Sequence, residues 1–377
     1  MAAIKTVEAI VTQVPIEKPT RISTRVLGHR DYLIVRVTDT DGVVGQGYTY
    51  SGTNGGTVLR EIVDAVFTPV LLGQDAEAVT QAWEQLYQEC LLIGRRGAAI
   101  RALSAVDIAL WDLKSRKYGA PLAVLLGGSL DPVSAYASGG YYRPDDGDWA
   151  DAVSREIETN ISAGFTDHKI KVGGLTVAED AARVAAAMGV MNGTGRLALD
   201  ANNAYRSVAE ARDALRAFED ATAGHGLWWF EEPFSPDNVA AHAELRLSSE
   251  TAIATGEIHQ TRWDFIDMFK RRAVDVVQAD VGVLGGVTEW LRVAHTAESY
   301  DVGIAPHWHA NLHAVLSAAT PGCFTVEHFL LEKDIYNFER LVTPETRQGF
   351  SDGALTFMDI PGLGFEFDDA AIQRFRI

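Results

Sequence analysis

The stretch from residue 168 to residue 257 reads HKIK (168–171), LALDAN (197–202), WWFEEP (228–233) and AIATGE (252–257), with a helix-length segment between each piece and the next. Each piece is a short apolar run that ends in a titratable side chain. Three later runs repeat the pattern, at QAD (278–280), PHWH (306–309) and VEH (326–328). Strands that alternate with helices are typical of a (β/α)₈ barrel, in which the carboxyl ends of all strands meet on one catalytic face. The pattern therefore predicts that seven strands bring titratable groups to one point.

The whole chain is predicted to be an α/β protein, with an N-terminal α+β domain, a (β/α)₈ barrel and a C-terminal segment of short strands and turns. A run of strands with a hairpin turn at Asp41-Gly42, followed by a run of helices, indicates the α+β part. Its predicted strands cover 4–16, 32–37 and 43–50, and its predicted helices cover 57–72, 78–91 and 98–118. Barrel strands are predicted at 133–138, 168–171, 197–201, 228–231, 252–256, 276–279, 303–306 and 324–326. We expect the α+β domain over 1–125, the barrel over 126–352, and a segment over 353–377 that follows the last barrel helix and packs back towards the first domain.

Composition narrows the possible partners and the compartment. The chain has 377 residues with 33 basic and 51 acidic side chains, a formal net charge of −18, which disfavours nucleic acid and anionic membranes as partners. Cys90 and Cys323 form no metal or redox motif, and this favours a reducing compartment. No apolar run approaches the roughly 20 residues of a membrane span, and the first residues alternate like a strand rather than a signal peptide. We expect a cytoplasmic homo-oligomer that binds a small molecule.

Three acids end consecutive predicted strands: Asp200, Glu231 and Glu257. Three carboxylates gathered without a cation would raise at least one pKa strongly, and an all-oxygen site with room for water and substrate suits Mg²⁺. The alternative is that some of the 51 acids end strands by chance. Asn202, two residues after Asp200, has the spacing to return its side chain to the same side.

Two further groups carry proton chemistry. Lys169 and Lys171 share one face of a strand, and neighbouring ammonium groups beside a metal lower each other's pKa, so that one lysine becomes a usable base. Asp280 and His307 end adjacent strands, and a carboxylate hydrogen-bonded to imidazole gives a group that donates or accepts a proton. A solvated lysine pair and a structural histidine are the respective alternatives. His309 lies near the same face.

At these residues the chain resembles the enolase superfamily, specifically its mandelate racemase subgroup, over essentially its whole length. The resemblance implies a modified (β/α)₈ TIM barrel with an N-terminal α+β capping domain and a C-terminal return segment. The resemblance implies Mg²⁺ held by Asp200, Glu231 and Glu257, with Asn202 beside it. It also implies Lys171 as the base on one face, with Lys169 near the substrate carboxylate. On the opposite face it implies the Asp280–His307 dyad, and it makes Glu327 the hydrogen-bond donor to the carboxylate. Sister groups with a lysine on the sixth strand or without Lys-x-Lys fit less well, and Ile258-His259 departs from mandelate racemase itself.

The reaction implied is abstraction of the proton α to a carboxylate, through an ene-diolate. Polar residues of the capping domain and of the first barrel loop favour a polyol chain over an apolar substrate, and we expect Arg25, Tyr48 and Tyr141, with Asn202 and His309, to contact it. Dehydration of a sugar acid to a 2-keto-3-deoxy acid is the first expectation. Racemisation, epimerisation or cycloisomerisation of a lactone or anhydro-sugar acid is the alternative within the subgroup. A catalytically silent binding protein that keeps the fold is the alternative of another class.

Overall fold

In the computed structural model, which describes residues 2–377, the N-terminal part forms an antiparallel sheet of three strands in the order β1-β2-β3. The strands are β1 (Ile4–Arg21), β2 (Val26–Asp39) and β3 (Val44–Tyr50). The helices that follow are α1 (Gly56–Ile62), a π turn (Val63–Phe67), α2 (Thr68–Leu71), α3 (Val79–Ile93), α4 (Ala98–Lys117) and α5 (Leu122–Leu125). Helix α4 packs directly on β3, because Gly45 and Gly47 carry no side chain: a Cβ on either would overlap the α4 backbone at Ala105 and Ala109.

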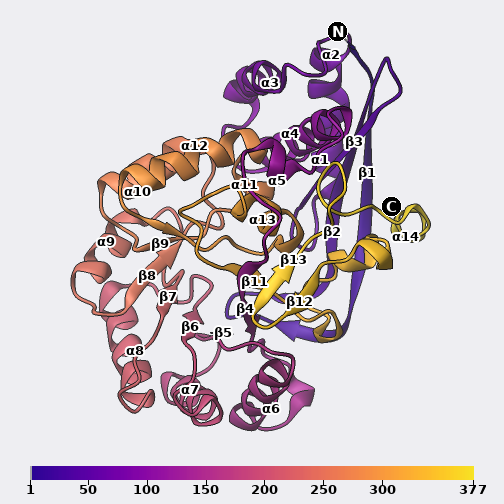
Figure 1. Cartoon of the computed structure of the whole chain (residues 1–377). Coiled ribbons are helices and arrows are strands. Elements are labelled where there is room, and N and C mark those ends of the chain that lie inside the picture. The colour runs from indigo at the N-terminus through magenta and orange to yellow at the C-terminus, as the bar shows by residue number, and fades with distance from the viewer. Residues whose placement is uncertain (1) are drawn as a thin grey trace.

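All eight predicted barrel strands are present as parallel neighbours (Figure 1). They are β4 (Val133–Gly139), β5 (His168–Lys171), β6 (Leu197–Asp200), β7 (Trp229–Glu231), β8 (Ala252–Thr255), β9 (Val276–Val277), β10 (Gly303–Ile304) and β11 (Val326–His328). The order is β10-β9-β8-β7-β6-β5-β4, and β11 pairs with the other edge of β4. Between β10 and β11 the described residues form an isolated bridge, Ile304 to Cys323, rather than a ladder.

Helices connect seven of the barrel strands to the next. They are α6 (Trp149–Ser162), α7 (Val177–Met191), α8 (Val208–Ala221), α9 (Val239–Leu247), α10 (Thr261–Lys270), α11 (Val281–Leu284) with α12 (Gly286–Ser299), and α13 (Ala310–Ser317). A 3₁₀ turn, Pro144–Asp146, precedes α6. None of the helices in residues 2–377 combines the length and apolar composition needed to cross a membrane.

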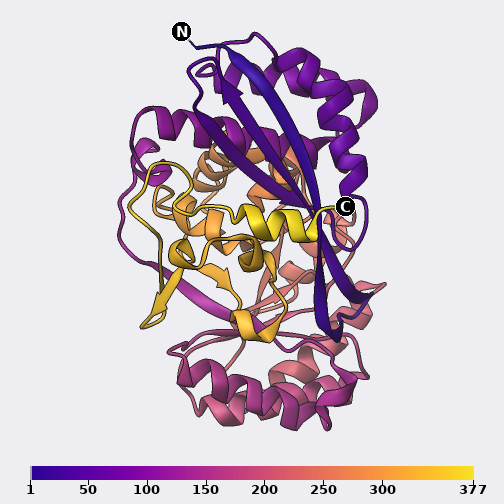
Figure 2. The ribbon, with the colours of Figure 1, turned by 90° about the vertical axis from the view of Figure 1, so that its right-hand side faces the viewer.

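The C-terminal segment returns to both earlier parts of the fold. The expected last barrel helix is not formed: β11 is followed by 3₁₀ turns at Leu331–Lys333, Phe338–Leu341 and Pro344–Thr346. The hairpin of β12 (Gly349–Ser351) and β13 (Ala354–Thr356) pairs with β4, so it spans the predicted boundary at 353. Helix α14 (Asp369–Phe375) lies against the capping sheet, where the Ile377 backbone N–H donates to the Val11 carbonyl at 3.0 Å (Figure 2).

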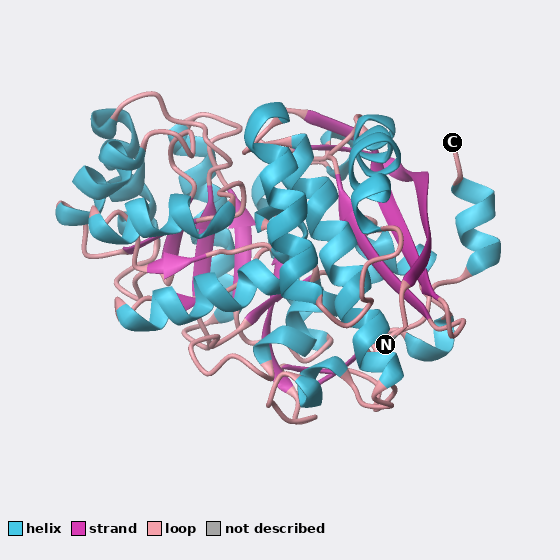
Figure 3. Ribbon diagram, turned by 90° about the horizontal axis from the view of Figure 1, so that it is seen from above, coloured by secondary structure: helices cyan, strands magenta, loops and turns pink. Residues whose placement is uncertain are grey.

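The largest core cluster joins the three parts of the chain. It contains Tyr32 and Tyr48 from the capping sheet, Trp308 from the barrel, and Phe338 and Phe365 from the C-terminal segment. Seen from above, the capping sheet has helices on one side and the C-terminal helix on the other (Figure 3). Phe338 and Phe365, which follow β11 in the chain, therefore join the capping sheet to the barrel in one core.

Candidate active site

The three acids predicted from the sequence lie together at the carboxyl ends of their strands. The parallel register places Lys171, Asp200 and Glu231 level with one another on β5, β6 and β7, and Glu257 follows β8 by two residues. Asp200, Glu231 and Glu257 are buried, and each offers an oxygen within 4.8 Å of the other two. The parallel pairing of consecutive strands is therefore what gathers the three carboxylates.

These carboxylates fit a hard divalent cation. Burial, and then the neighbouring Glu232 and Asp200 carboxylates, raise the pKa of Glu257 well above its usual value. Glu257 Oε2 and Asn202 Oδ1 are buried and accept no hydrogen bond from the described residues. A divalent ion would neutralise the negative charges of the three carboxylates. The two oxygens without a hydrogen bond would be available to coordinate it, and oxygen ligands are those that Mg²⁺ prefers.

The two lysines of β5 occupy different environments. Lys169 is fully buried, and its Nζ lies 2.8 Å from Glu231 Oε1 and 2.8 Å from Glu327 Oε1. Lys171 is ion-paired with Asp200, lies 5.0 Å from the Tyr141 ring centroid and faces a cavity. Burial is the largest single effect and lowers the pKa of Lys171, but Asp200, Tyr141 and other neighbours together outweigh it and raise the pKa overall. A cation that engages Asp200 would remove that opposition to a neutral lysine.

The Asp280–His307 pair forms as predicted. His307 Nδ1 lies 2.9 Å from Asp280 Oδ2, and Asp280 Oδ1 accepts a hydrogen bond of 2.8 Å from the Gly282 backbone N–H at the start of α11. Burial, followed by the charges of Lys169 and Lys171, lowers the pKa of His307 well below its usual value. An imidazolium formed here would therefore give up its proton readily.

A cavity of about 510 Å³ lies between the barrel mouth and the capping domain. Lys171, His307, Glu257 and Asn202 form its floor, together with Glu232 and Asn203. Lys169, Asp200, Glu231, Asp280 and Glu327 do not line it. Of the four residues predicted to carry proton chemistry, Lys171 from β5 and His307 from beyond β10 therefore reach the cavity. Their two strands are separated by four others in the sheet order.

Comparison with known proteins matches both parts of the chain. The family description "Enolase C-terminal domain-like" matches residues 152–371, and "Mandelate racemase / muconate lactonizing enzyme, N-terminal domain" matches residues 6–127. The chain belongs to the enolase superfamily, in the mandelate racemase subgroup. It is 31% identical to arabinonate dehydratase of Saccharolobus solfataricus, over 92% of this chain and 91% of that protein. It is 32% identical to D-galactarolactone cycloisomerase of Agrobacterium fabrum, over 92% of both.

The fold of this chain also matches a solved structure of a sugar-acid dehydratase. L-talarate dehydratase from Polaromonas sp. JS666, complexed with Mg and L-glucarate, superposes with a TM-score of 0.86 at 29% identity, over 100% of this chain and 98% of that one. The protein is therefore an enzyme of the mandelate racemase subgroup, and its cofactor is Mg²⁺.

Two residues expected to contact substrate in this member of the superfamily lie behind the cavity wall. Tyr48 is fully buried: its hydroxyl lies 3.0 Å from the Tyr336 hydroxyl, and its ring stacks on Phe338 with centroids 3.7 Å apart. Tyr50, two residues further along the same face of β3, lines the cavity instead. His309 is fully buried behind His307, with its Nε2 3.6 Å from Asp280 Oδ1. By contrast, Arg25, Tyr141 and Asn202 line the cavity.

The sequence reasoning missed a fourth buried carboxylate. It is Glu232, which directly follows the end of β7, where strand alternation no longer indicates the direction of a side chain. The backbone at Glu232 has φ 41°, which turns its side chain back to the cavity, where it accepts a hydrogen bond from the Asn203 side chain. Burial, followed by Asp200, raises the pKa of Glu232. No strand periodicity could have indicated this reversal.

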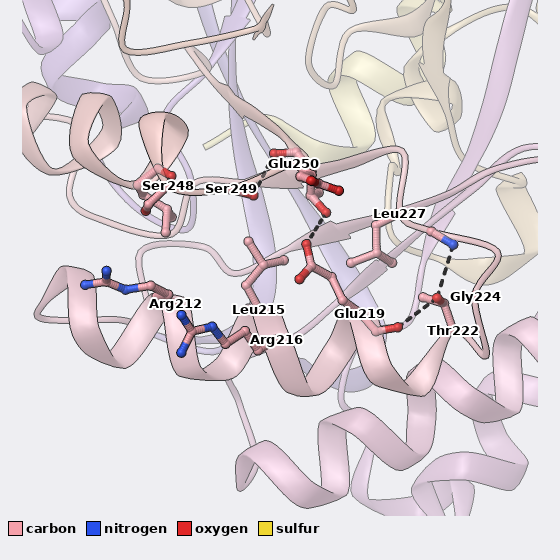
Figure 4. Close-up of a pocket in the computed structure, with 13 residues that line it drawn as sticks. Arg212, Leu215, Arg216, Glu219, Thr222, Gly224, Leu227, Ser248, Ser249 and Glu250 are labelled. Atoms are coloured by element: carbon pink, nitrogen blue, oxygen red, sulfur yellow. Dashed lines mark hydrogen bonds between the residues drawn. The ribbon is translucent and has the colours of Figure 1, made fainter.

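A second cavity, of about 530 Å³, lies at the other end of the barrel strands between α8 and α9 (Figure 4). Arg212, Leu215 and Glu219 of α8 line it, and Glu219 accepts a hydrogen bond of 2.6 Å from the Thr251 hydroxyl. It contains none of the acids, lysines or histidines that the family chemistry uses. It is therefore separate from the active site.

Proposed function

We propose that this enzyme dehydrates a sugar acid to a 2-keto-3-deoxy acid. The observation that carries the proposal is that Lys171 and His307 both line one cavity, approaching from different sides of the barrel. A base and an acid on different sides suit removal of the α-proton and departure of the β-hydroxyl. Arg25, Tyr141 and Asn202 in the cavity wall support a polar substrate.

The remaining groups hold the site in place. Asp200, Glu231 and Glu257 would hold Mg²⁺, with Asn202 beside them. When bound, the ion supplies the positive charge that makes the α-proton of a carboxylate acidic enough to remove. Lys169 fixes Glu231 and Glu327 at 2.8 Å each, and Glu327 Oε2 accepts a hydrogen bond of 2.7 Å from the Trp308 backbone N–H. Lys169 and Glu327 thus orient the metal ligands and the loop that presents His307.

The proposed steps conserve atoms and electrons. Lys171 Nζ takes the α-proton, and the C–H electron pair becomes the double bond of an ene-diolate. That double bond shifts as the β C–O bond breaks, and the oxygen leaves as water with a proton from His307 Nε2. Asp280 holds the imidazole through its 2.9 Å hydrogen bond to Nδ1. The enol product then takes a proton at the β-carbon and loses its hydroxyl proton to solvent, which gives the 2-keto acid.

A second candidate, cycloisomerisation, uses the same first step. The 32% identity to D-galactarolactone cycloisomerase over 92% of the chain is as high as the identity to the dehydratase relative. In that case a ring oxygen would leave in place of hydroxide, and the product would keep the mass of the substrate.

Deuterium exchange separates the roles of the two faces. With Mg²⁺ and a substrate whose α-proton faces Lys171, His307→Asn should exchange that proton with D₂O but release no 2-keto acid. Lys171→Ala should lose both exchange and product, and a product lighter by one water identifies dehydration. If His307→Asn forms product normally while Lys171→Ala still exchanges, the assignment of base and acid is wrong.

A further inference from the structure

The wall that the capping domain contributes to the active-site cavity is positively charged. Among the residues that line it are Arg25, Arg30 and Arg101, whereas no Asp or Glu of the capping domain lines it. The chain as a whole has 51 acidic and 33 basic side chains. A cluster of arginines without a neighbouring acid in the same wall is therefore unusual for this composition. The cluster lies across the cavity from the carboxylates of the barrel floor.

None of these three arginines forms an ion pair with a carboxylate of residues 2–377. Eleven other arginines of the described chain form ion pairs. Arg30 and Arg183 are the two nearly buried arginines, at 5% and 1% exposure, and Arg183 is paired with Asp180 at 2.8 Å. Arg30 instead donates from Nε to the Ile335 carbonyl at 3.0 Å. A buried guanidinium without a counter-charge is costly, so an anion is the missing partner.

Aromatic side chains hold two of the arginines close to the reacting groups. The Arg30 guanidinium lies 4.2 Å from the Trp308 ring centroid, and the Trp308 ring lies 5.8 Å from the His307 ring. Arg101 donates to the Tyr50 carbonyl at 3.0 Å and lies 5.0 Å from the Tyr50 ring centroid. The stacking orients both guanidinium groups and leaves donors free to bind a planar carboxylate.

We propose that the substrate is a sugar diacid: its first carboxylate meets the metal site, and its second is bound by Arg30 and Arg101, with Arg25 at the rim. This inference rests on the proposed function, because it takes the first carboxylate to bind at the barrel floor. A monoacid ends in a neutral hydroxymethyl group, which would leave the buried Arg30 charge unpaired. A sugar acid with a terminal phosphate would offer the same anionic chemistry and is tested separately.

Matched acid pairs that differ only at the distal carbon test the proposal. The magnesium-loaded enzyme is given galactarate and galactonate, then glucarate and gluconate, and gluconate 6-phosphate as the phosphate arm. Formation of 2-keto acid gives kcat/KM, and titration calorimetry gives the Kd of each acid. We expect a diacid to exceed its monoacid by about 10- to 100-fold in kcat/KM or in affinity.

Arg101→Met should reduce this ratio to near one, mainly by raising KM for the diacid. Arg30→Met should have the same effect if the variant folds. If it does not fold, Arg101→Met still tests the proposal, because Arg101 is not buried. Arg96→Met is the matched control, because Arg96 pairs with Asp237 and Asp264 and does not line this cavity. It should leave the ratio unchanged.

Equal binding and turnover of diacid and monoacid, with no effect of Arg101→Met, would overturn the diacid assignment. A preference for the terminal phosphate over both diacids would also overturn it. Failure of the proposed function looks different: diacids would bind with Arg101-dependent affinity but undergo neither α-proton exchange nor dehydration.

Discussion

Replacing Lys169 by Met should destabilise the fold strongly, because this lysine neutralises two buried carboxylates at once. Its Nζ lies 2.8 Å from Glu231 and 2.8 Å from Glu327, and all three side chains are at most 1% exposed. Breaking a buried pair by removing one partner costs about 3–5 kcal/mol. We expect a loss of that size in the free energy of unfolding, measured in EDTA at pH 8 by urea denaturation and circular dichroism.

The loss should depend on pH in a defined direction. Burial, followed by the neighbouring Asp200 charge, already raises the pKa of Glu231 in the native enzyme. A carboxyl group with a raised folded-state pKa contributes stability below its unfolded pKa and loses it as the pH rises through the folded value. Removing the ammonium raises that folded pKa further. The cost of Lys169→Met should therefore be at least about 1 kcal/mol smaller at pH 5 than at pH 8.

A double-mutant cycle identifies the ion pair as the cause. Glu327→Gln removes one of the two charges, so Lys169→Met with Glu327→Gln should cost about 1–3 kcal/mol less than the sum of the single changes. Lys270→Met, at an exposed position on α10, is the control and should stay within about 0.5 kcal/mol of the parent. The reasoning is refuted if Lys169→Met costs less than about 1 kcal/mol, or if the two changes are additive.

Two further predictions concern the metal and acid stability. Glu257→Gln should weaken Mg²⁺ binding by about 100-fold or more in calorimetry, since it removes a charged ligand from the three-carboxylate group. Wild-type affinity in this variant would exclude Glu257 as a ligand. Burial lowers the pKa of His168 to about 4, so its stabilising contribution is complete above pH 6.5 and is lost as the pH falls. His168→Leu should therefore lose about 1.4 kcal/mol less than the parent between pH 8 and pH 5.5, and equal losses in denaturant titrations would contradict this.

The barrel and its acids could be predicted from the sequence because both depend on local pattern. Strand periodicity and helix-length spacing located all eight strands, although β9 and β10 are only two residues long. The carboxyl ends of parallel strands must meet, so Asp200, Glu231 and Glu257 could be placed together before any coordinates. The same argument placed His307 next to Asp280.

What could not be predicted depends on contacts between distant parts of the chain. Tyr48 and Tyr50 share one face of β3, and only the docking of the C-terminal segment on Tyr48 decides that Tyr50 reaches the cavity. Arg101 lies on a helix whose approach to the barrel no periodicity specifies. The side chain of Glu232 turns towards the cavity because its backbone is left-handed, a conformation that a glutamate in the sequence does not predict.

The positions of the charged residues indicate that the barrel carries out the chemistry and the capping domain selects the substrate. The groups that we propose to remove the α-proton and to hold the metal come from barrel strands that are fixed by buried ion pairs, whereas Arg30 and Arg101 come from the capping domain. A change in the capping domain should therefore alter which acid binds without altering the chemistry of a bound acid. Saturating Arg101→Met with a diacid should consequently restore α-proton exchange with D₂O to nearly the parental kcat. If exchange remains slow at saturation, Arg101 also orients the reacting carbon, and binding and chemistry are not separable in this enzyme.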